Sequence, residues 1–155
     1  MKIVRELPTL EATRQLGQEL GARARFTPGL VIALVGQLGA GKTHLTRALA
    51  EGLGLGDSRI VNSPTFVLLQ EYSADLPIYH FDAYRLPNSA AFADLGAQEY
   101  FEGQGICVVE WGDRVADCLP SDYLRITLEV TGETSRRATL EAFGAESQKL
   151  LSALG

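Results

Sequence analysis

The chain has 155 residues, a net charge of −5 and 46% hydrophobic residues, which suits one globular domain with one core. Its longest apolar run, Leu30–Val35, is too short to cross a bilayer, and the first fifteen residues lack a signal-peptide core, so we expect a cytoplasmic protein that does not contact a membrane. The three lysines form no basic stripe, which excludes a stand-alone nucleic-acid binder; any RNA would be held through a partner.

The first half of the chain predicts a strand, a helix and a second strand–helix unit. Ile3–Leu7 is expected to be a strand, and Thr9 is expected to cap the helix that follows it. The apolar face of that helix repeats at three- and four-residue steps through Leu10, Thr13, Leu16, Leu20 and Ala24. Leu30–Val35 then predicts a strand, His44–Leu53 a helix, and Ile60-Val61 an extended segment.

The second half predicts mainly strands, joined by short helices. Phe66–Tyr72 and Ile78–Asp82 are separated by a short turn, which favours an antiparallel hairpin. Short helices over Asn88–Leu95 and Gln98–Phe101 precede a strand at Ile106–Glu110, and these are followed by a strand at Tyr123–Val130, a returning strand at Arg136–Glu141 and a helix at Gly144–Leu154. The sum predicts an α/β, three-layer fold with a mixed parallel and antiparallel sheet, as a single domain over residues 1–155.

A glycine-rich loop lies between the strand at 30–35 and the next helix. Residues 36–43, GQLGAGKT, match the whole of G-x-x-x-x-G-K-[ST]. Glycines let successive backbone N–H groups approach a phosphate, and the helix that follows adds unpaired N–H groups and a partial positive charge. Lys42 is expected to reach the β- and γ-phosphates, and the Thr43 hydroxyl to bind Mg²⁺. The motif predicts a nucleotide site and makes the expected three-layer fold P-loop NTPase-like, with residues 1–155 as one P-loop domain.

A phosphate-binding loop also needs a carboxylate near the Mg²⁺ ion, and two acids are candidates for it. Glu110 ends ICVVE, whose apolar positions suit a strand buried on both faces. Such a strand would lie beside the strand at 30–35 that leads into the glycine loop, so we expect Glu110 to be the acid at the Mg²⁺ ion. Asp82 ends IYHFD, which mixes polar and apolar residues and suits a more exposed hairpin strand, so we expect it to position the attacking water or act as a base. A helix-capping role for Glu110 and a turn role for Asp82 are the alternatives.

Several other polar residues stay open on sequence grounds. Ser63 and Thr65 lie where P-loop proteins carry a nucleotide-sensing segment, but Ser-Pro turn chemistry explains them equally well. His80 is expected to be a structural hydrogen-bonding residue. Trp111 suits the core, a stacking role or a partner contact alike. Arg136 and Arg137 are expected to be solvated strand charges, and one of them could also reach a nucleotide.

The sequence also limits which base the bound nucleotide carries and which class of reaction the protein catalyses. No lysine lies in the Asn-Lys-x-Asp segment with which Ras-type GTPases recognise guanine, so adenine, and hence ATP, is favoured. A small-molecule kinase is the main alternative, but it usually closes an arginine-bearing lid over the phosphates, and residues 88–105 contain neither arginine nor lysine. A nucleotide-dependent binding module with negligible catalysis is the third possibility.

Four segments together carry a family resemblance. GQLGAGKT, SPTF, YHFDAYRL and VVEW, in this order and at these distances, resemble the TsaE family, the small ATPase of the bacterial tRNA threonylcarbamoyladenosine machinery. The resemblance implies a slow ATP hydrolase that works with the TsaB–TsaD pair, in which TsaD transfers threonylcarbamoyl to the adenosine next to the anticodon. Hydrolysis would reset that complex, and tRNA would be met only through it.

The resemblance also implies roles for individual residues. It places Mg²⁺ at Thr43 and Glu110, and hydrolysis or partner engagement at Thr65, Asp82 and Trp111. It places the adenine near Leu10 and Thr13, with Arg137 at the far end. With the loop, the expected cofactor-binding residues are Leu10, Thr13, Gly36, Gly39, Ala40, Gly41, Lys42, Thr43, His44, Trp111 and Arg137, and the expected catalytic residues are Thr65, Asp82 and Glu110. The chain departs from the family pattern at Gln37, at His44, and at Gly112, where a proline is common.

Overall fold

The computed structural model describes residues 1–37, 39–61, 68–84 and 86–154, and its centre is a seven-stranded sheet. The strands lie in the order β1-β7-β6-β2-β5-β4-β3. They are β1 (Lys2–Leu7), β2 (Val31–Val35), β3 (Leu69–Ser73), β4 (Pro77–Asp82), β5 (Ile106–Glu110), β6 (Tyr123–Val130) and β7 (Arg136–Phe143). The helical segments are α1 (Leu10–Ala24), α2 (Lys42–Gly52), η1 (Ser58–Ile60), α3 (Ser89–Ala93), α4 (Ala97–Phe101), η2 (Gly112–Cys118) and α5 (Ala145–Leu154).

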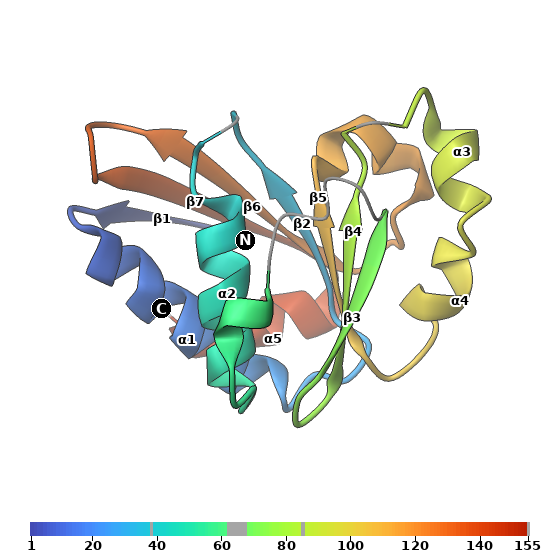
Figure 1. Cartoon of the computed structure of the whole chain (residues 1–155), viewed down its shortest axis with the longest axis horizontal. Coiled ribbons are helices and arrows are strands. Elements are labelled where there is room, and N and C mark those ends of the chain that lie inside the picture. Colours follow the sequence, from blue (N-terminus) through green and yellow to red (C-terminus); the bar gives the residue numbers. More distant parts are fainter. Residues whose placement is uncertain (38, 62–67, 85, 155) are drawn as a thin grey trace.

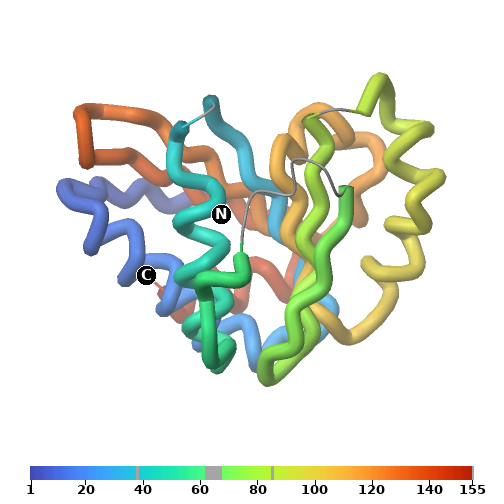
Figure 2. Tube along the Cα trace, viewed as in Figure 1, coloured from blue at the N-terminus to red at the C-terminus, as the bar shows by residue number. Residues whose placement is uncertain are grey.

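The sheet is parallel around β2 and antiparallel towards both edges. β2 pairs in parallel with β5 and with β6, and β4 pairs in parallel with β5. The hairpins β3–β4 and β6–β7 are antiparallel, as is the pairing of β1 with β7, which brings the first strand of the chain beside the last (Figure 2). The mixed α/β fold expected from the sequence is therefore confirmed.

Helices cover both faces of the central strands, which gives two cores (Figure 1). Because successive strand residues point to opposite faces, β2 contributes Ile32 to the core under α1, α2 and α5, and Val31 to the core under α3, α4 and η2. In β5 every residue is buried, as the unbroken apolar run predicted. Among the described residues, no helix is long and apolar enough to span a membrane.

The helix that follows the glycine loop is held by very close contact with α1. A Cβ atom added to Gly21 would lie 2.1 Å from the Leu49 carbonyl oxygen, and one added to Gly52 would lie 2.2 Å from the Gln18 carbonyl oxygen. The two backbones approach so closely only because these positions carry no side chain. The Thr9 hydroxyl accepts a hydrogen bond from the Ala12 N–H at 3.0 Å, which confirms the predicted cap of α1.

Three local expectations differ from the structure. Ile60, expected to be extended, lies in the 3₁₀ turn η1, because the Asp57 side chain caps that turn by accepting from the Arg59 N–H. Strand β3 begins at Leu69, so Leu68 is not part of it, while Phe66 and the expected functional residue Thr65 lie outside the described residues. Strand β4 was expected to be a more exposed strand of the hairpin, but most of its residues are buried.

The burial of β4 follows from its neighbours in the sheet. It pairs with β3 on one side and with β5 on the other. Phe81 packs against Phe92 of α3 and Phe101 of α4, and is fully buried. Asp82 at its end is only 6% exposed. The mixed sequence of IYHFD reflects a buried polar site and not a solvated face.

Candidate nucleotide site

The glycine loop leaves the end of β2 and enters α2 in the way the motif predicts. Gly41 has a φ of +103°, a conformation that favours glycine, and it is the residue before the first turn of α2. A Cβ atom on Gly36 would lie 2.7 Å from the Leu128 carbonyl oxygen of β6, so the start of the loop also requires glycine. The first N–H groups of α2 consequently face the space beside the loop.

Lys42 lies buried at the centre of this site. Its Nζ donates to the carbonyl oxygens of Gly36 at 2.7 Å and Gln37 at 2.9 Å, and lies 4.1 Å from the centre of the Trp111 ring. Burial lowers the pKa of the ammonium group, and the carboxylate of Glu110 partly opposes that effect. The amine is therefore held by the loop itself, at a point from which it can reach an anion in the same space.

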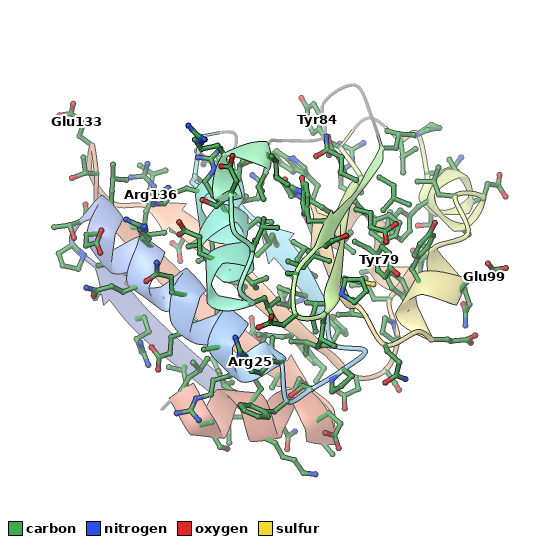
Figure 3. The ribbon with its side chains drawn as sticks, turned by 60° about the horizontal axis from the view of Figure 1, so that its bottom comes forward. Arg25, Tyr79, Tyr84, Glu99, Glu133 and Arg136 are labelled. Atoms are coloured by element: carbon green, nitrogen blue, oxygen red, sulfur yellow. The ribbon has the colours of Figure 1, made fainter. Side chains whose placement is uncertain are left out.

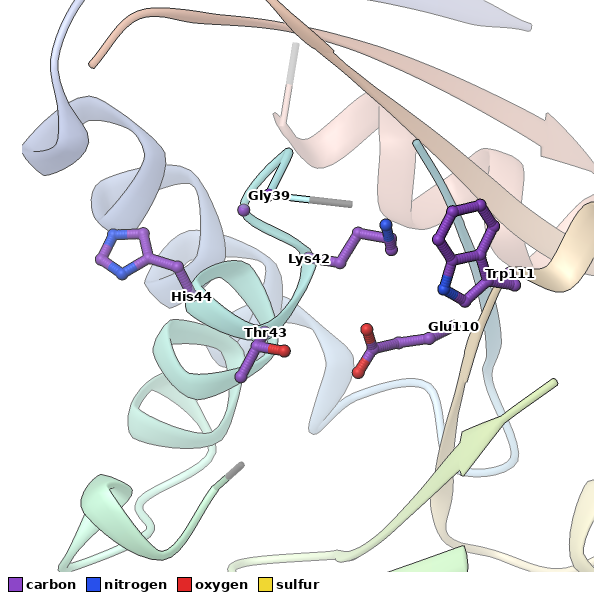
Figure 4. Close-up of a pocket in the computed structure, with 7 residues that line it drawn as sticks. Gly39, Lys42, Thr43, His44, Glu110 and Trp111 are labelled. Carbon is purple, nitrogen blue, oxygen red and sulfur yellow. The ribbon is translucent and has the colours of Figure 1, made fainter. Parts of the chain in front are cut away.

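A cavity of about 320 Å³ opens over the loop (Figure 4). Its lining includes Gly39, Gly41, Lys42, Thr43, His44, Glu110 and Trp111. Figure 4 shows the Thr43 hydroxyl and the Glu110 carboxylate directed towards each other across this space. Seven predicted site residues are thus brought together.

The donor set in the cavity suits a magnesium ion. The Thr43 hydroxyl and the Glu110 carboxylate are both hard oxygen ligands, and Glu110 is 3% exposed at the end of β5, beside β2. The described residues hold no group of three or more His, Cys, Asp or Glu side chains arranged as a metal site. Magnesium sites at nucleotides need only one or two protein oxygens, because phosphate and water supply the others, so the residues present fit this ion.

Asp82 and Glu110 occupy matching positions on neighbouring parallel strands. The two residues are register partners in the β4–β5 ladder, so their side chains leave the same face of the sheet. The Asp82 carboxylate accepts a hydrogen bond from the Tyr84 N–H at 2.9 Å. The turn role left open for Asp82 is thus confirmed, and Asp82 is not among the described residues that line the cavity.

His80 contacts the predicted metal ligand directly, which the sequence analysis missed. His80 is fully buried, and its Nε2 lies 2.5 Å from Oε2 of Glu110. The expectation that it is a hydrogen-bonding residue is confirmed, but its partner was not foreseen. The available signal was the alternation of the two strands, since residues 78, 80 and 82 share one face with residues 106, 108 and 110.

Trp111 combines a strained backbone with an aromatic contact. It has a φ of +61°, and in the described residues no other non-glycine residue has a positive φ. Its ring lies 4.9 Å from that of Tyr84, centre to centre. The next residue has no room for a side chain, because a Cβ on Gly112 would lie 2.6 Å from the Cβ of Ala33. The glycine at this position is therefore explained by close packing on β2.

The residues expected to hold adenine lie at the α1 end of the site. His44 Nε2 lies 3.3 Å from the Leu10 carbonyl oxygen, which links α2 to the start of α1. Thr13 is 1% exposed, and its hydroxyl has no hydrogen-bond partner among the described residues. Arg137, by contrast, does not lie with these residues: its Nε is 2.7 Å from Oε1 of Glu6 in β1. Its role stays a prediction.

Arg136 is the arginine that contacts the loop. Its Nε donates to the Ala40 carbonyl oxygen at 2.9 Å, and one terminal nitrogen donates to the Gly39 carbonyl oxygen at 3.4 Å. Figure 3 shows Arg136 on the side of the molecule opposite Tyr79 and Glu99. Sequence alone could not choose between Arg136 and Arg137. The choice follows from strand parity, because Arg136 shares its face with Ala138 and Leu140 of the core under α1 and α2.

Strand, glycine loop and helix on a mixed sheet define a P-loop-type α/β domain. A crystal structure of YdiB from Bacillus subtilis has the same fold, with a TM-score of 0.83 and 36% identity over 99% of this chain and 94% of that one. The family described as "Threonylcarbamoyl adenosine biosynthesis protein TsaE" matches residues 7–138. This chain belongs to the TsaE family.

Curated members of that family are similar over most of their length. The chain is 43% identical to a tRNA threonylcarbamoyladenosine biosynthesis protein TsaE of Bacillus subtilis, over 90% of this chain and 85% of that protein. It is 46% identical to the protein of the same name from Treponema pallidum, over 72% of this chain and 82% of the other.

Proposed function

We propose that this protein binds ATP with Mg²⁺ in the cavity over the glycine loop, hydrolyses it slowly, and thereby supports threonylcarbamoyl modification of the tRNA adenosine next to the anticodon. The observation that carries the proposal is the convergence of Lys42, Thr43 and Glu110 on one cavity at the start of α2. A cation, a hydroxyl and a carboxylate so arranged suit the phosphates of a metal-bound nucleotide.

The loop would bind the phosphate tail through its backbone. The N–H groups at the start of α2 would donate to the phosphate oxygens, and Lys42 would exchange its bonds to the Gly36 and Gln37 carbonyl oxygens for bonds to phosphate. The adenine is expected near Leu10 and Thr13 at the start of α1, where Nε2 of His44 contacts the Leu10 carbonyl oxygen.

Thr43 and Glu110 would hold the Mg²⁺ ion. When bound, the ion neutralises charge on the phosphate oxygens and lowers the barrier to attack. Glu110 is suited to this task because its carboxylate is buried at a strand end, where it contacts Nε2 of His80.

Asp82 would orient the attacking water and accept its proton. The water oxygen forms a bond to the γ-phosphorus while the bond from that phosphorus to the β–γ bridging oxygen breaks, giving ADP and inorganic phosphate. The position of Asp82 opposite Glu110 in the β4–β5 ladder supports this division of labour. Trp111 would shield the Lys42 amine from solvent on the other side.

The family supports the biological context of this ATPase. Its members are named for tRNA threonylcarbamoyladenosine biosynthesis, and we propose that TsaB and TsaD are the partners of this chain. With a net charge of −5, this chain would contact tRNA only through that complex. A kinase is disfavoured, because α3 and α4, at the place of a lid, pack Phe92 and Ala97 into the core.

The proposal predicts different defects for Lys42→Ala and Asp82→Asn. Lys42→Ala should abolish detectable ATP binding, because the loop loses its cation. Asp82→Asn should bind ATP within about threefold of the unmodified chain yet hydrolyse it at least about tenfold more slowly, because general-base catalysis contributes on the order of a hundredfold. Calorimetry at millimolar Mg²⁺ and phosphate release measure the two. Equal loss of binding in both variants would show that the division of roles is wrong.

The partners are tested by measuring phosphate release with and without TsaB–TsaD. We expect slow release from the protein alone and a changed rate with both partners present. Phosphate transfer to a metabolite without any partner effect would favour the kinase, and binding without release under either condition would favour a binding module. A pull-down of TsaB and TsaD with ATP and with ADP then identifies the nucleotide state that they engage.

A further inference from the structure

A row of polar side chains crosses three neighbouring strands beneath the cavity. Nε2 of His80 in β4 lies 2.5 Å from Oε2 of Glu110 in β5, and Nδ1 of the same ring lies 3.2 Å from the Tyr72 hydroxyl in β3. The Tyr72 hydroxyl also contacts the side-chain amide of Gln70. His80 is 0% exposed, Glu110 3% and Tyr72 4%, so water does not compete for these bonds.

The row is built by the strand register. Residues 78, 80 and 82 of β4 share the sheet face that carries Glu110, and Gln70 lies directly opposite His80 in the β3–β4 hairpin. On that face the imidazole has Ile78 and Val108 as apolar neighbours, and Asp82 as its other neighbour along β4. A buried imidazole in such a place is costly unless both ring nitrogens have partners, and here both do.

We infer that His80, backed by Tyr72, is a positioning residue that holds the Glu110 carboxylate in the orientation needed to bind Mg²⁺; this inference rests on the proposed function. An ionised carboxylate only accepts hydrogen bonds, so Nε2 carries the hydrogen and occupies one oxygen, Oε2. The other oxygen is left for the cavity. The Tyr72 contact at Nδ1 fixes the plane of the ring.

The arrangement does more than satisfy a buried histidine. Glutamate has three rotatable side-chain bonds, and a single contact to a ring that is itself fixed at its far side selects one orientation of the carboxylate. Partners of this kind, one sphere removed from a metal, typically change metal affinity about 10- to 100-fold when they are lost. The effect should therefore appear in the magnesium dependence of nucleotide binding, and not in nucleotide binding as such.

The first arm of the test observes the pair without nucleotide. The chain has only two histidines, so ¹⁵N-imidazole NMR assigns His80 by difference from His44→Gln. We expect a slowly exchanging hydrogen on Nε2 of His80, which shifts and exchanges faster in Glu110→Ala. Ile78→Val is the matched control, because it alters packing two residues away on the same strand face without removing the acceptor. If the signal of the Nε2 hydrogen of His80 is unchanged in Glu110→Ala, the inference is overturned.

The second arm measures fluorescent ADP binding against Mg²⁺ concentration and, separately, in EDTA. His80→Leu, which removes the donor, should raise the Mg²⁺ concentration for half-maximal affinity about 10- to 100-fold while affinity in EDTA stays within about twofold. His80→Gln, whose side-chain nitrogen can replace Nε2, should restore the midpoint to within about threefold. Tyr72→Phe should give a smaller shift in the same direction as His80→Leu.

The outcomes separate the two proposals. An unchanged Mg²⁺ midpoint in His80→Leu overturns the positioning role. An equal loss in EDTA and in Mg²⁺, matched by Ile78→Val, shows a structural role only and also overturns it. If the unmodified chain binds no nucleotide in either condition, the proposed function fails, and the NMR arm still decides whether His80 holds Glu110.

Discussion

Arg136 and Arg137 are adjacent in β7 but serve opposite faces of the sheet. Arg136 donates to the Gly39 and Ala40 carbonyl oxygens, whereas Arg137 is exposed and pairs with Glu6. The loop can direct its N–H groups inward only if its carbonyl groups point outward, and Arg136 supplies donors for two of them. An arginine outside the motif therefore helps to shape the loop.

The two arginines predict different effects on nucleotide affinity. Arg136→Ala should weaken ATP and ADP binding about fivefold, or about 1 kcal/mol, because two carbonyl groups lose a charged donor in a partly exposed position. Arg137→Ala should weaken binding less than Arg136→Ala. Calorimetry on both variants makes the comparison. The reverse order would favour the family-based expectation that Arg137 contacts the adenine.

At the scale of elements, the contact between α1 and α2 sets where the loop lies. α2 begins at Lys42, so any shift of that helix also shifts the loop and its cation. Glycines on both helices allow the close approach, and the periodic apolar face of α1 was visible in the sequence. The closeness was not, because glycine in a helix pattern is equally compatible with a loose contact.

Gly21→Ala should destabilise the protein. The new methyl group would have to lie 2.1 Å from the Leu49 carbonyl oxygen, so the helices must separate; overpacking of this kind costs about 1–3 kcal/mol and outweighs the helix propensity that alanine gains. Urea unfolding measures the change. Gly56→Ala is the control, since nothing lies within 4 Å of an added Cβ there, and it should be close to neutral. Equal stability of the two variants would contradict this account of the helix contact.

At the scale of the whole molecule, two cores share one sheet. Cys107 is buried in the core under α3 and α4, so its thiol can be used to measure the stability of that core. Burial raises the pKa of its thiol from the ordinary 9.0 to about 12. Between those values the unfolded chain has lost the thiol proton while the folded chain keeps it. Stability contributed by this group is therefore full below about pH 9 and decreases as the pH rises towards 12, by up to about 1.4 kcal/mol per pH unit.

The difference in free energy of unfolding between Cys107→Ala and the unmodified chain should therefore shrink at alkaline pH. At pH 7.5 the variant should be less stable than the unmodified chain, because it leaves a cavity. The difference should shrink between pH 9 and pH 10.5, measured by urea unfolding at each pH. Val109→Ala, on the same face of β5 and without a titratable group, should keep a constant difference. A constant difference for Cys107→Ala as well would contradict the alkaline effect.

Local patterns were sufficient to predict most elements and the centre of the site. The glycine loop, the cap at Thr9 and the buried strand ending in Glu110 are each encoded in a few consecutive residues, and the structure bears them out. The predictions failed where neighbours in space decide the outcome. IYHFD was expected to be exposed, yet β4 is buried because β3 and the α3–α4 pair cover it.

The sequence by itself determined the P-loop-type domain, the mixed sheet and the residues that converge on the cavity over the glycine loop, because spacing, glycine content and apolar periodicity act over short stretches of chain. Only the tertiary structure decided that His80 contacts Glu110, thirty residues away, and that Arg136 contacts the loop in place of Arg137. These pairings depend on strand register and strand order, which are set by the packing of the whole sheet; alternation along a strand indicates which residues share a face but does not identify their partners.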